Sequence, residues 1–179
     1  MAGIEVRRLR PDDDRSQFRS GNLQLDEFFR RYAGQNQFRH LIGTTYVATE
    51  ARTIVGFATV SPCSISIDQL PPEQKAQLPR YPLPALRLAR LAVAESAVGR
   101  GVGRDLLRTV FKLAREMAED LGCVGIVVDA KPEAITFYER YGFHRIETLE
   151  GNLRQPSVHV AMFLALGSIP RSVAQPDRQ

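Results

Sequence analysis

The sequence predicts a single domain of the α/β (α+β) class, in which strands and helices alternate along the chain. Three observations predict it. Apolar, β-rich runs alternate with stretches of helical periodicity. The 179 residues, 44% of them hydrophobic and 25% charged, suit one soluble domain with a substantial core. An apolar strand also runs into a glycine-rich turn that opens a long amphipathic helix, so the two kinds of element follow each other directly.

The expected strands are runs rich in β-branched and apolar residues; they cover residues 4–9, 44–49, 54–67, 86–93, 125–130, 144–149 and 158–166. The expected helices show apolar residues at helical spacing; they cover residues 23–32, 73–77, 103–121 and 132–141. Residues 50–52 are predicted to connect a hairpin, and residues 70–84 form a proline-rich excursion. The domain is expected to cover residues 1–166, followed by a polar tail at 167–179.

Two apolar stripes define the helix faces that are expected to be buried. In the first helix the stripe consists of Leu25, Phe28, Phe29 and Tyr32. In the long helix it consists of Leu106, Leu107, Val110, Leu113, Ala114 and Met117.

The turn before the long helix has glycine at positions 99, 101 and 103. Glycine adopts the dihedral angles of tight turns, and the first amides of a helix lack intrahelical acceptors. Such a turn can hold a phosphate or pyrophosphate, or it can serve the chain geometry alone. The dinucleotide fingerprint is excluded because Arg104 and Leu106 stand where it needs glycine. A P-loop is excluded because no Gly-Lys-Ser/Thr follows.

The net charge of +4 comes from an uneven set of cations, because only three of the 24 basic residues are lysines. Arginine pairs with phosphate in a forked geometry, but an arginine excess also arises from a GC-rich genome. Cys63 and Cys123 have neither metal-ligand nor redox spacing, so no metal is expected and both read as reduced structural thiols. Neither a signal region nor a membrane-length apolar run is present, which predicts a cytoplasmic protein without membrane contact.

Three motifs together carry a family resemblance. They are Arg-Leu-Ala-Val at 90–93, the glycine turn, and Phe-Tyr-Glu-Arg-Tyr-Gly-Phe at 137–143. In order and spacing they resemble the GNAT acyltransferases over residues 4–166, with Val98 departing from the usual Gln or Arg. The resemblance implies a mixed, mostly antiparallel central sheet with splayed strands, flanked by helices. It also implies acetyl-CoA as cosubstrate.

The same resemblance assigns the cosubstrate to particular residues. The pantetheine arm would pair with the strand at Leu91, Ala92 and Val93, where a backbone N–H can polarise the thioester carbonyl. The pyrophosphate would bind the turn formed by Gly99, Arg100, Gly101, Val102, Gly103 and Arg104. The side chains of Arg100 and Arg104 either add charge at this point or lie in solvent.

Tyr138 occupies the position at which the family often has a general acid. A phenol is protonated at neutral pH and can give its proton to the departing thiolate. The alternative is a tyrosine that only packs beneath the cosubstrate. For the general base, many relatives carry a glutamate in the strand where this chain has Arg87 and Arg90, while Glu95 reads as a solvated turn residue. An α-amine, with a pKa of about 7.7 to 8.0, needs the least deprotonation.

Segments 18–29 and 78–84 resemble more closely the toxin branch of toxin–antitoxin pairs within this family. That branch acetylates the α-amine of aminoacyl-tRNA and is held inactive by a ribbon-helix-helix antitoxin. Arg80, Arg87 and Arg90 would then contact tRNA phosphates, or else be solvated surface charges. A homodimer is possible, with residues 153–160 either at its interface or closing the core.

Two other functions remain open on the sequence alone. One is a general acetyltransferase for a small amine, a polyamine or a protein N-terminus. The other is a module that binds acetyl-CoA without catalysis. Such a module has no need of a proton donor at Tyr138.

Overall fold

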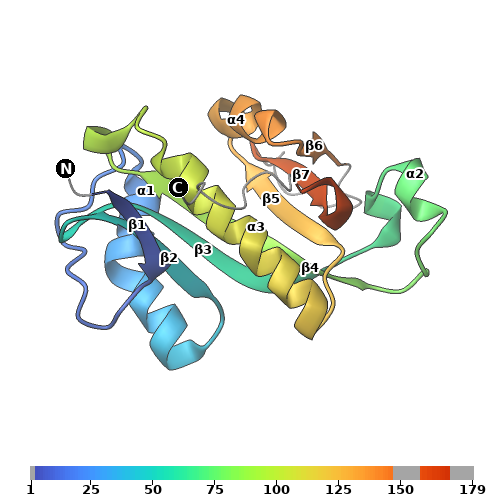
Figure 1. Cartoon of the computed structure of the whole chain (residues 1–179), viewed down its shortest axis with the longest axis horizontal. Coiled ribbons are helices and arrows are strands. Elements are labelled where there is room, and N and C mark those ends of the chain that lie inside the picture. The colour runs from blue at the N-terminus through green and yellow to red at the C-terminus, as the bar shows by residue number, and fades with distance from the viewer. Residues whose placement is uncertain (1–2, 147–157, 170–179) are drawn as a thin grey trace, which may run out of the picture. The chain divides into compact units, whose positions relative to one another are not determined.

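The computed structural model describes residues 3–146 and 158–169. Its seven strands form a sheet in the order β1-β2-β3-β4-β5-β7-β6 (Figure 1). The pairs β1/β2, β2/β3, β5/β7 and β6/β7 are antiparallel, as expected for a mixed, mostly antiparallel sheet. The strands are β1 (Ile4–Arg8), β2 (Thr44–Glu50), β3 (Thr53–Ile65), β4 (Leu83–Val93), β5 (Gly125–Ala130), β6 (His144–Arg145) and β7 (Val160–Ala165).

The chain divides into two compact units. The first comprises residues 1–61 and 88–112, and the second comprises residues 62–87 and 113–179. Three elements begin in one unit and end in the other: β3, β4 and the long helix α3 (Val102–Asp120).

In the first unit, a helical segment begins where the sequence predicts but continues further. Asn22 caps α1 (Leu23–Glu27), its side chain accepting a hydrogen bond from the Leu25 amide at 3.0 Å. The helix then widens into π-helical turns, η1 (Phe28–Tyr32) and η2 (Gln35–His40). Because a π-turn bonds i to i+5 rather than i+4, it shifts the buried stripe.

This shift overturns part of the expected stripe. Phe28 and Phe29 are buried, but Tyr32 is 47% exposed and Ala33 takes the inward position. The core of the first unit is accordingly aromatic. The Phe29 and Phe57 rings stack at 4.3 Å between centroids, and Phe18 meets both edge-on.

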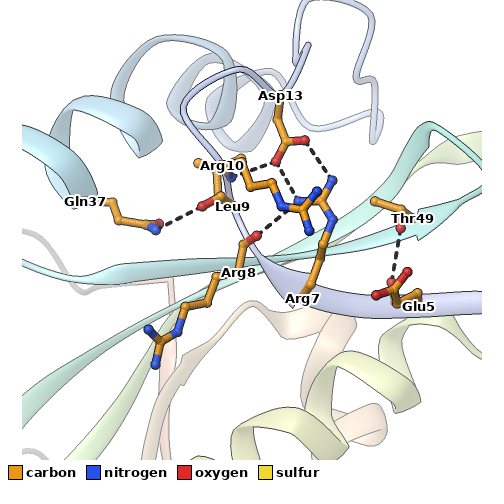
Figure 2. Close-up of polar contacts among 8 residues, drawn as sticks. All are labelled: Glu5, Arg7, Arg8, Leu9, Arg10, Asp13, Gln37 and Thr49. Carbon is orange, nitrogen blue, oxygen red and sulfur yellow. Dashed lines mark hydrogen bonds and ion pairs between the residues drawn. The ribbon is translucent and has the colours of Figure 1, made fainter.

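The turn that follows β1 is fixed by one carboxylate (Figure 2). Asp13 accepts two hydrogen bonds from the Arg7 guanidinium, at 2.7 and 2.8 Å, and one from the Arg10 amide at 2.7 Å. The Arg7 guanidinium hydrogen bond lowers the pKa of Asp13 below its ordinary value, although partial burial opposes the effect. Gln37 of η2 bridges the strands, donating to the Leu9 carbonyl at 3.2 Å and accepting from the Thr45 amide at 2.8 Å.

The second unit has its own apolar core between β5, β7 and the excursion. It consists of Ile65, Leu70, Leu83, Ala85, Val127 and Phe163. The β5/β7 ladder runs from Gly125 opposite Ala165 to Ala130 opposite Val160. Gly125 is required here, since a Cβ at this position would lie too close to the backbone oxygen of Leu164.

The other helical elements are η3 (Ile67–Gln69), α2 (Pro72–Lys75), η4 (Glu95–Ala97), η5 (Pro132–Ala134), α4 (Ile135–Arg140) and η6 (Leu166–Ser168). Outside the first segment, the predicted helices differ from the observed ones at their ends, and three short 3₁₀ turns, η3, η4 and η6, were not predicted. Of the stripe expected in α3, Leu113 and Met117 are only half-buried, while Phe111 is buried. Strand β4 starts at Leu83, three residues earlier than predicted. Proline is tolerated there because Pro84 contributes its carbonyl, which accepts from the Val124 amide at 2.8 Å.

Some predictions concern residues at or beyond the edge of the described chain. Those for residues 147–149 and 153–157, and for most of the tail, lie outside the described residues. Ile169, the last residue described, is buried, and its carbonyl accepts a hydrogen bond from Arg115 at 3.3 Å. The predicted division at residue 166 stays a prediction.

Candidate functional site

The glycine turn leaves β4 through η4 and enters α3. Gly99 and Gly101 have φ angles of +80° and +82°, in the left-handed region that favours glycine. The Asp105 amide donates to the Gly101 carbonyl at 3.0 Å, which closes the first turn of the helix. The preceding amides, of Val102, Gly103 and Arg104, lie at a helix N-terminus, where N–H groups have no intrahelical acceptor. A helix N-terminus of this kind is a favourable position for an anion such as phosphate.

Strand β3 supports this turn from within the first unit. The Ala94 amide donates to the Val55 carbonyl at 2.8 Å. Gly56 allows close packing, because a Cβ there would lie 2.7 Å from Cγ1 of Val102 and 3.1 Å from the Ala92 oxygen. Val98, the departure from the family pattern, is 68% exposed. Its side chain therefore points away from the packed part of the turn.

Both arginines of the turn have acidic neighbours. Arg100 donates to Oε1 of Glu50, at the end of β2, at 2.5 Å. This hydrogen bond lowers the pKa of Glu50 and raises that of Arg100. Arg104 donates to Oδ1 of Asp105 at 3.3 Å. Both arginines are exposed, so each can still turn toward an anion in solvent.

The three residues expected beside the pantetheine arm lie at the C-terminal end of β4. Ala92 is buried, and Leu91 and Val93 are half-buried. They lead into Ala94 and the glycine turn without interruption. The strand and the turn thus form one continuous segment of the first unit.

In the second unit, α4 carries Tyr138. The side chain is buried and its ring lies edge-on to those of Phe137 and Phe143, with centroids 5.2 and 5.4 Å away. The Tyr138 carbonyl accepts from the amides of Tyr141 and Phe143, which ties the helix end to the segment that follows. Burial raises the pKa of Tyr138 far above the ordinary phenol value. The phenol is therefore protonated at neutral pH when no ligand is bound.

The three arginines proposed from the sequence lie in different surroundings. Arg80 is exposed in the excursion. Arg87 is in the second unit and pairs with Asp129 at 2.7 Å. Arg90 is in the first unit, where its guanidinium carbon lies 3.7 Å above the centroid of the Phe28 ring.

Sequence reasoning missed Glu50, Asp129 and Phe28 as partners of these arginines. Glu50 is 50 residues from Arg100, and Asp129 is 42 residues from Arg87. No local pattern marks such pairs. Phe28 was identified only as a core residue, which it also is.

Two features are absent from the described residues, a cluster of metal-ligating side chains and a membrane-spanning helix. Residues 3–146 and 158–169 contain no cluster of His, Cys, Asp and Glu able to hold a metal ion. Over the same ranges, no helix combines the length and apolarity needed to cross a membrane. Cys63 and Cys123 are free thiols, and burial raises the pKa of both.

Comparison with known proteins decides the family. Residues 42–145 match the acetyltransferase (GNAT) domain family. The chain belongs to the GNAT acetyltransferase family. A tRNA-acetylating toxin of Mycobacterium tuberculosis (strain ATCC 25618 / H37Rv) is 32% identical over 147 residues, covering 80% of this chain and 86% of the relative. A probable toxin TacT of Sinorhizobium fredii (strain NBRC 101917 / NGR234) is 26% identical, covering 87% of each.

Solved structures share the GNAT fold of this chain. The crystal structure of a bacterial toxin superposes with a TM-score of 0.86 at 23% identity, covering 100% of this chain and 99% of the other. AtaT complexed with acetyl-methionyl-tRNAfMet superposes with a TM-score of 0.82 at 22% identity, covering 93% and 96%. At these identities the likeness establishes the GNAT fold.

Proposed function

We propose that this GNAT acetyltransferase transfers the acetyl group of acetyl-CoA to the α-amine of an aminoacyl-tRNA. It would thereby act as the toxin of a toxin–antitoxin pair and block translation in the cytoplasm. The observation that carries the proposal is the 32% identity, across 80% of the chain, to a relative named as a tRNA-acetylating toxin. The resemblance of the Phe18–Phe29 and Leu78–Pro84 segments to the toxin branch supports it as well.

In this proposal, the glycine turn binds the pyrophosphate of acetyl-CoA. Its strand-to-helix geometry, two positive φ angles and the amides of Val102 to Arg104 suit that anion. Arg100 and Arg104 add positive charge at the rim. The backbone of Leu91, Ala92 and Val93 pairs with the pantetheine arm, and an N–H of this strand polarises the thioester carbonyl.

The chemistry is an aminolysis of a thioester. The neutral α-amine attacks the carbonyl carbon, a C–N bond forms and the C–S bond breaks. The departing thiolate receives a proton from the Tyr138 hydroxyl, the amine loses a proton to solvent, and a proton from solvent restores the Tyr138 hydroxyl. An α-amine with a pKa of about 7.7 to 8.0 is substantially neutral at cellular pH, so this step needs no strong protein base.

Substrate contacts and partners complete the proposal. Arg80, Arg87 and Arg90 are assigned to the tRNA surface, where phosphates are the dominant electrostatic target. We propose that a ribbon-helix-helix protein is its antitoxin and that the protein forms a homodimer. The structure of AtaT bound to the C-terminus of the antitoxin AtaR concerns a protein of the same fold.

A cell-free translation reaction tests this function. Translation should stop only when both the protein and acetyl-CoA are present, and fresh aminoacyl-tRNA added after removal of the protein should restore it. Inhibition without acetyl-CoA would point to a different mode of toxicity. Unaffected translation, with acetylation of polyamines or peptides instead, would make the chain a general acetyltransferase.

A further inference from the structure

Arg90 differs from three other arginines that lie in or beside the β-strands of this structure. Arg7, Arg87 and Arg100 each form an ion pair with a carboxylate, at 2.5 to 2.7 Å. Arg90 is half-buried, and within residues 3–146 and 158–169 its guanidinium forms no ion pair with a carboxylate. Burial lowers its pKa, which reflects a cation taken partly out of water without an anion to compensate. A desolvated, uncompensated cation attracts an anionic ligand.

The contact with Phe28 leaves the hydrogen-bonding groups of Arg90 unused. The guanidinium carbon lies 3.7 Å above the ring centroid, so the flat face of the cation is occupied. The five N–H donors of a guanidinium lie in its plane, and a ring below that plane does not engage them. A stacked arginine therefore presents its donors edgewise, which suits two-point recognition of a phosphate.

Phe28 is a rigid support for this arrangement. It is buried beside Phe57, with ring centroids 6.3 Å apart. It also begins the π-helical turn η1, and π-helical turns within α-helices occur often at functional sites. The segment containing Phe28 is one of the two that set this chain apart from general GNAT enzymes. Its part in function would be to hold Arg90 in place.

We propose that Arg90, stacked on Phe28, binds a backbone phosphate near the aminoacylated end of the tRNA. The inference rests on the proposed function, and it separates Arg90 from Arg87, whose guanidinium already pairs with Asp129. Position favours a phosphate near the reactive end, because Arg90 directly precedes Leu91 to Val93. A phosphodiester is also the anion that the proposed substrate carries beside its reactive amine.

The test measures binding of a fluorescent single-stranded RNA ending in CCA, as a function of salt, by wild-type protein and by Arg90→Gln. Loss of one phosphate contact should raise Kd about tenfold and reduce the slope of log Kd against log salt by about 0.7 to 1. Arg90→Lys keeps the charge but not the planar fork. It should keep the wild-type slope and bind RNA with intermediate affinity.

Arg15→Gln is the matched control. Arg15 is also half-buried in the first unit, and burial likewise lowers its pKa, but it donates to the Phe29 carbonyl at 3.1 Å. Its loss should lower stability and leave the salt slope unchanged. If Arg90→Gln binds RNA with wild-type affinity and slope, the inference is wrong. The inference is also wrong if Arg90→Gln binds RNA like the wild type but binds an acidic peptide more weakly, because Arg90 would then bind a carboxylate and not a phosphate.

The proposed function is read separately, from acetyl transfer to aminoacyl-tRNA by the wild-type protein. Absence of transfer, together with a reduced RNA salt slope in Arg90→Gln, would overturn the function and keep the phosphate contact. Acetyl transfer by the wild-type protein, together with an unchanged RNA salt slope in Arg90→Gln, would support the function and overturn the phosphate contact. Thermal unfolding of each variant verifies that the comparison is made between folded proteins.

Discussion

At the scale of single residues, burial decides what Tyr138 can do. The ring is enclosed by Phe137 and Phe143, and the low polarity around it disfavours a phenolate. The raised pKa keeps the hydroxyl protonated throughout the range in which an α-amine becomes neutral. A proton donor and a neutral nucleophile can therefore be present at the same pH. Packing and catalysis, alternatives on the sequence alone, become compatible roles for one side chain.

Removing the Tyr138 hydroxyl tests that role. We expect Tyr138→Phe to lower kcat by about 10²- to 10⁴-fold, the usual contribution of general acid catalysis, with little change in KM for acetyl-CoA. Steady-state kinetics measure both. Tyr141→Phe is the control, since it keeps the ring contact with Phe137 and should retain activity. A wild-type kcat in Tyr138→Phe would leave this tyrosine with a packing role only.

Asp13 makes a second residue-scale prediction, for stability against acid. Its folded-state pKa lies below the ordinary value, so its contribution is present above about pH 3.9 and is lost as pH falls through the lower folded value. Between pH 7 and pH 3, wild-type protein should therefore lose about 1 kcal/mol more unfolding free energy than Asp13→Asn. Urea unfolding at both pH values measures this. The exposed neighbour Asp12 provides the control, Asp12→Asn, which should follow the wild type.

At the scale of elements, the strand–turn–helix segment β4–η4–α3 carries the proposed acetyl-CoA site of the first unit. The turn needs left-handed backbone at Gly99 and Gly101, and it needs the close approach of β3 at Gly56. These requirements explain glycine at three positions without any appeal to ligand contact. The proposed anion site would then be a consequence of the geometry that starts the helix.

Gly101→Ala should disturb this site more than the fold. The left-handed conformation costs a non-glycine residue about 1 to 2 kcal/mol. A turn that relaxes from it would raise the acetyl-CoA Kd about tenfold. Gly122→Ala, at the other end of α3 with φ of +105°, is the control: it should lower Tm comparably and leave Kd unchanged. Calorimetric titration with acetyl-CoA measures both Kd values. Equal Kd values for the two variants would show that the glycine turn does not bind acetyl-CoA.

How much the sequence predicts depends on whether the determinant is local. β5 was predicted with its observed bounds, because Gly125 to Ala130 is a short apolar run between turn signals. The helix after Asn22 was predicted at its start but not through His40, because a change from α- to π-turns leaves no simple period. Because the π-turns were not predicted, Tyr32 was wrongly expected to lie on the buried face of the helix. Of the site, the glycine turn was recognisable, and its distant partner Glu50 was not.

At the scale of the whole molecule, the number of arginines overstates the positive charge that is free to bind an anion. Arg7, Arg87 and Arg100 neutralise Asp13, Asp129 and Glu50, respectively. Net charge therefore says little about nucleic-acid binding here. The proposed toxin function rests instead on membership of the GNAT family and on the 32% identity to a relative named as a tRNA-acetylating toxin.

The most direct test of this account is transfer of labelled acetyl from acetyl-CoA to a mixture of charged tRNAs, uncharged tRNA, polyamines and peptides. The account predicts label on the α-amine of one or more aminoacyl-tRNAs, absent from uncharged tRNA, and the labelled amino acid identifies the target. Label confined to polyamines or peptides would contradict it.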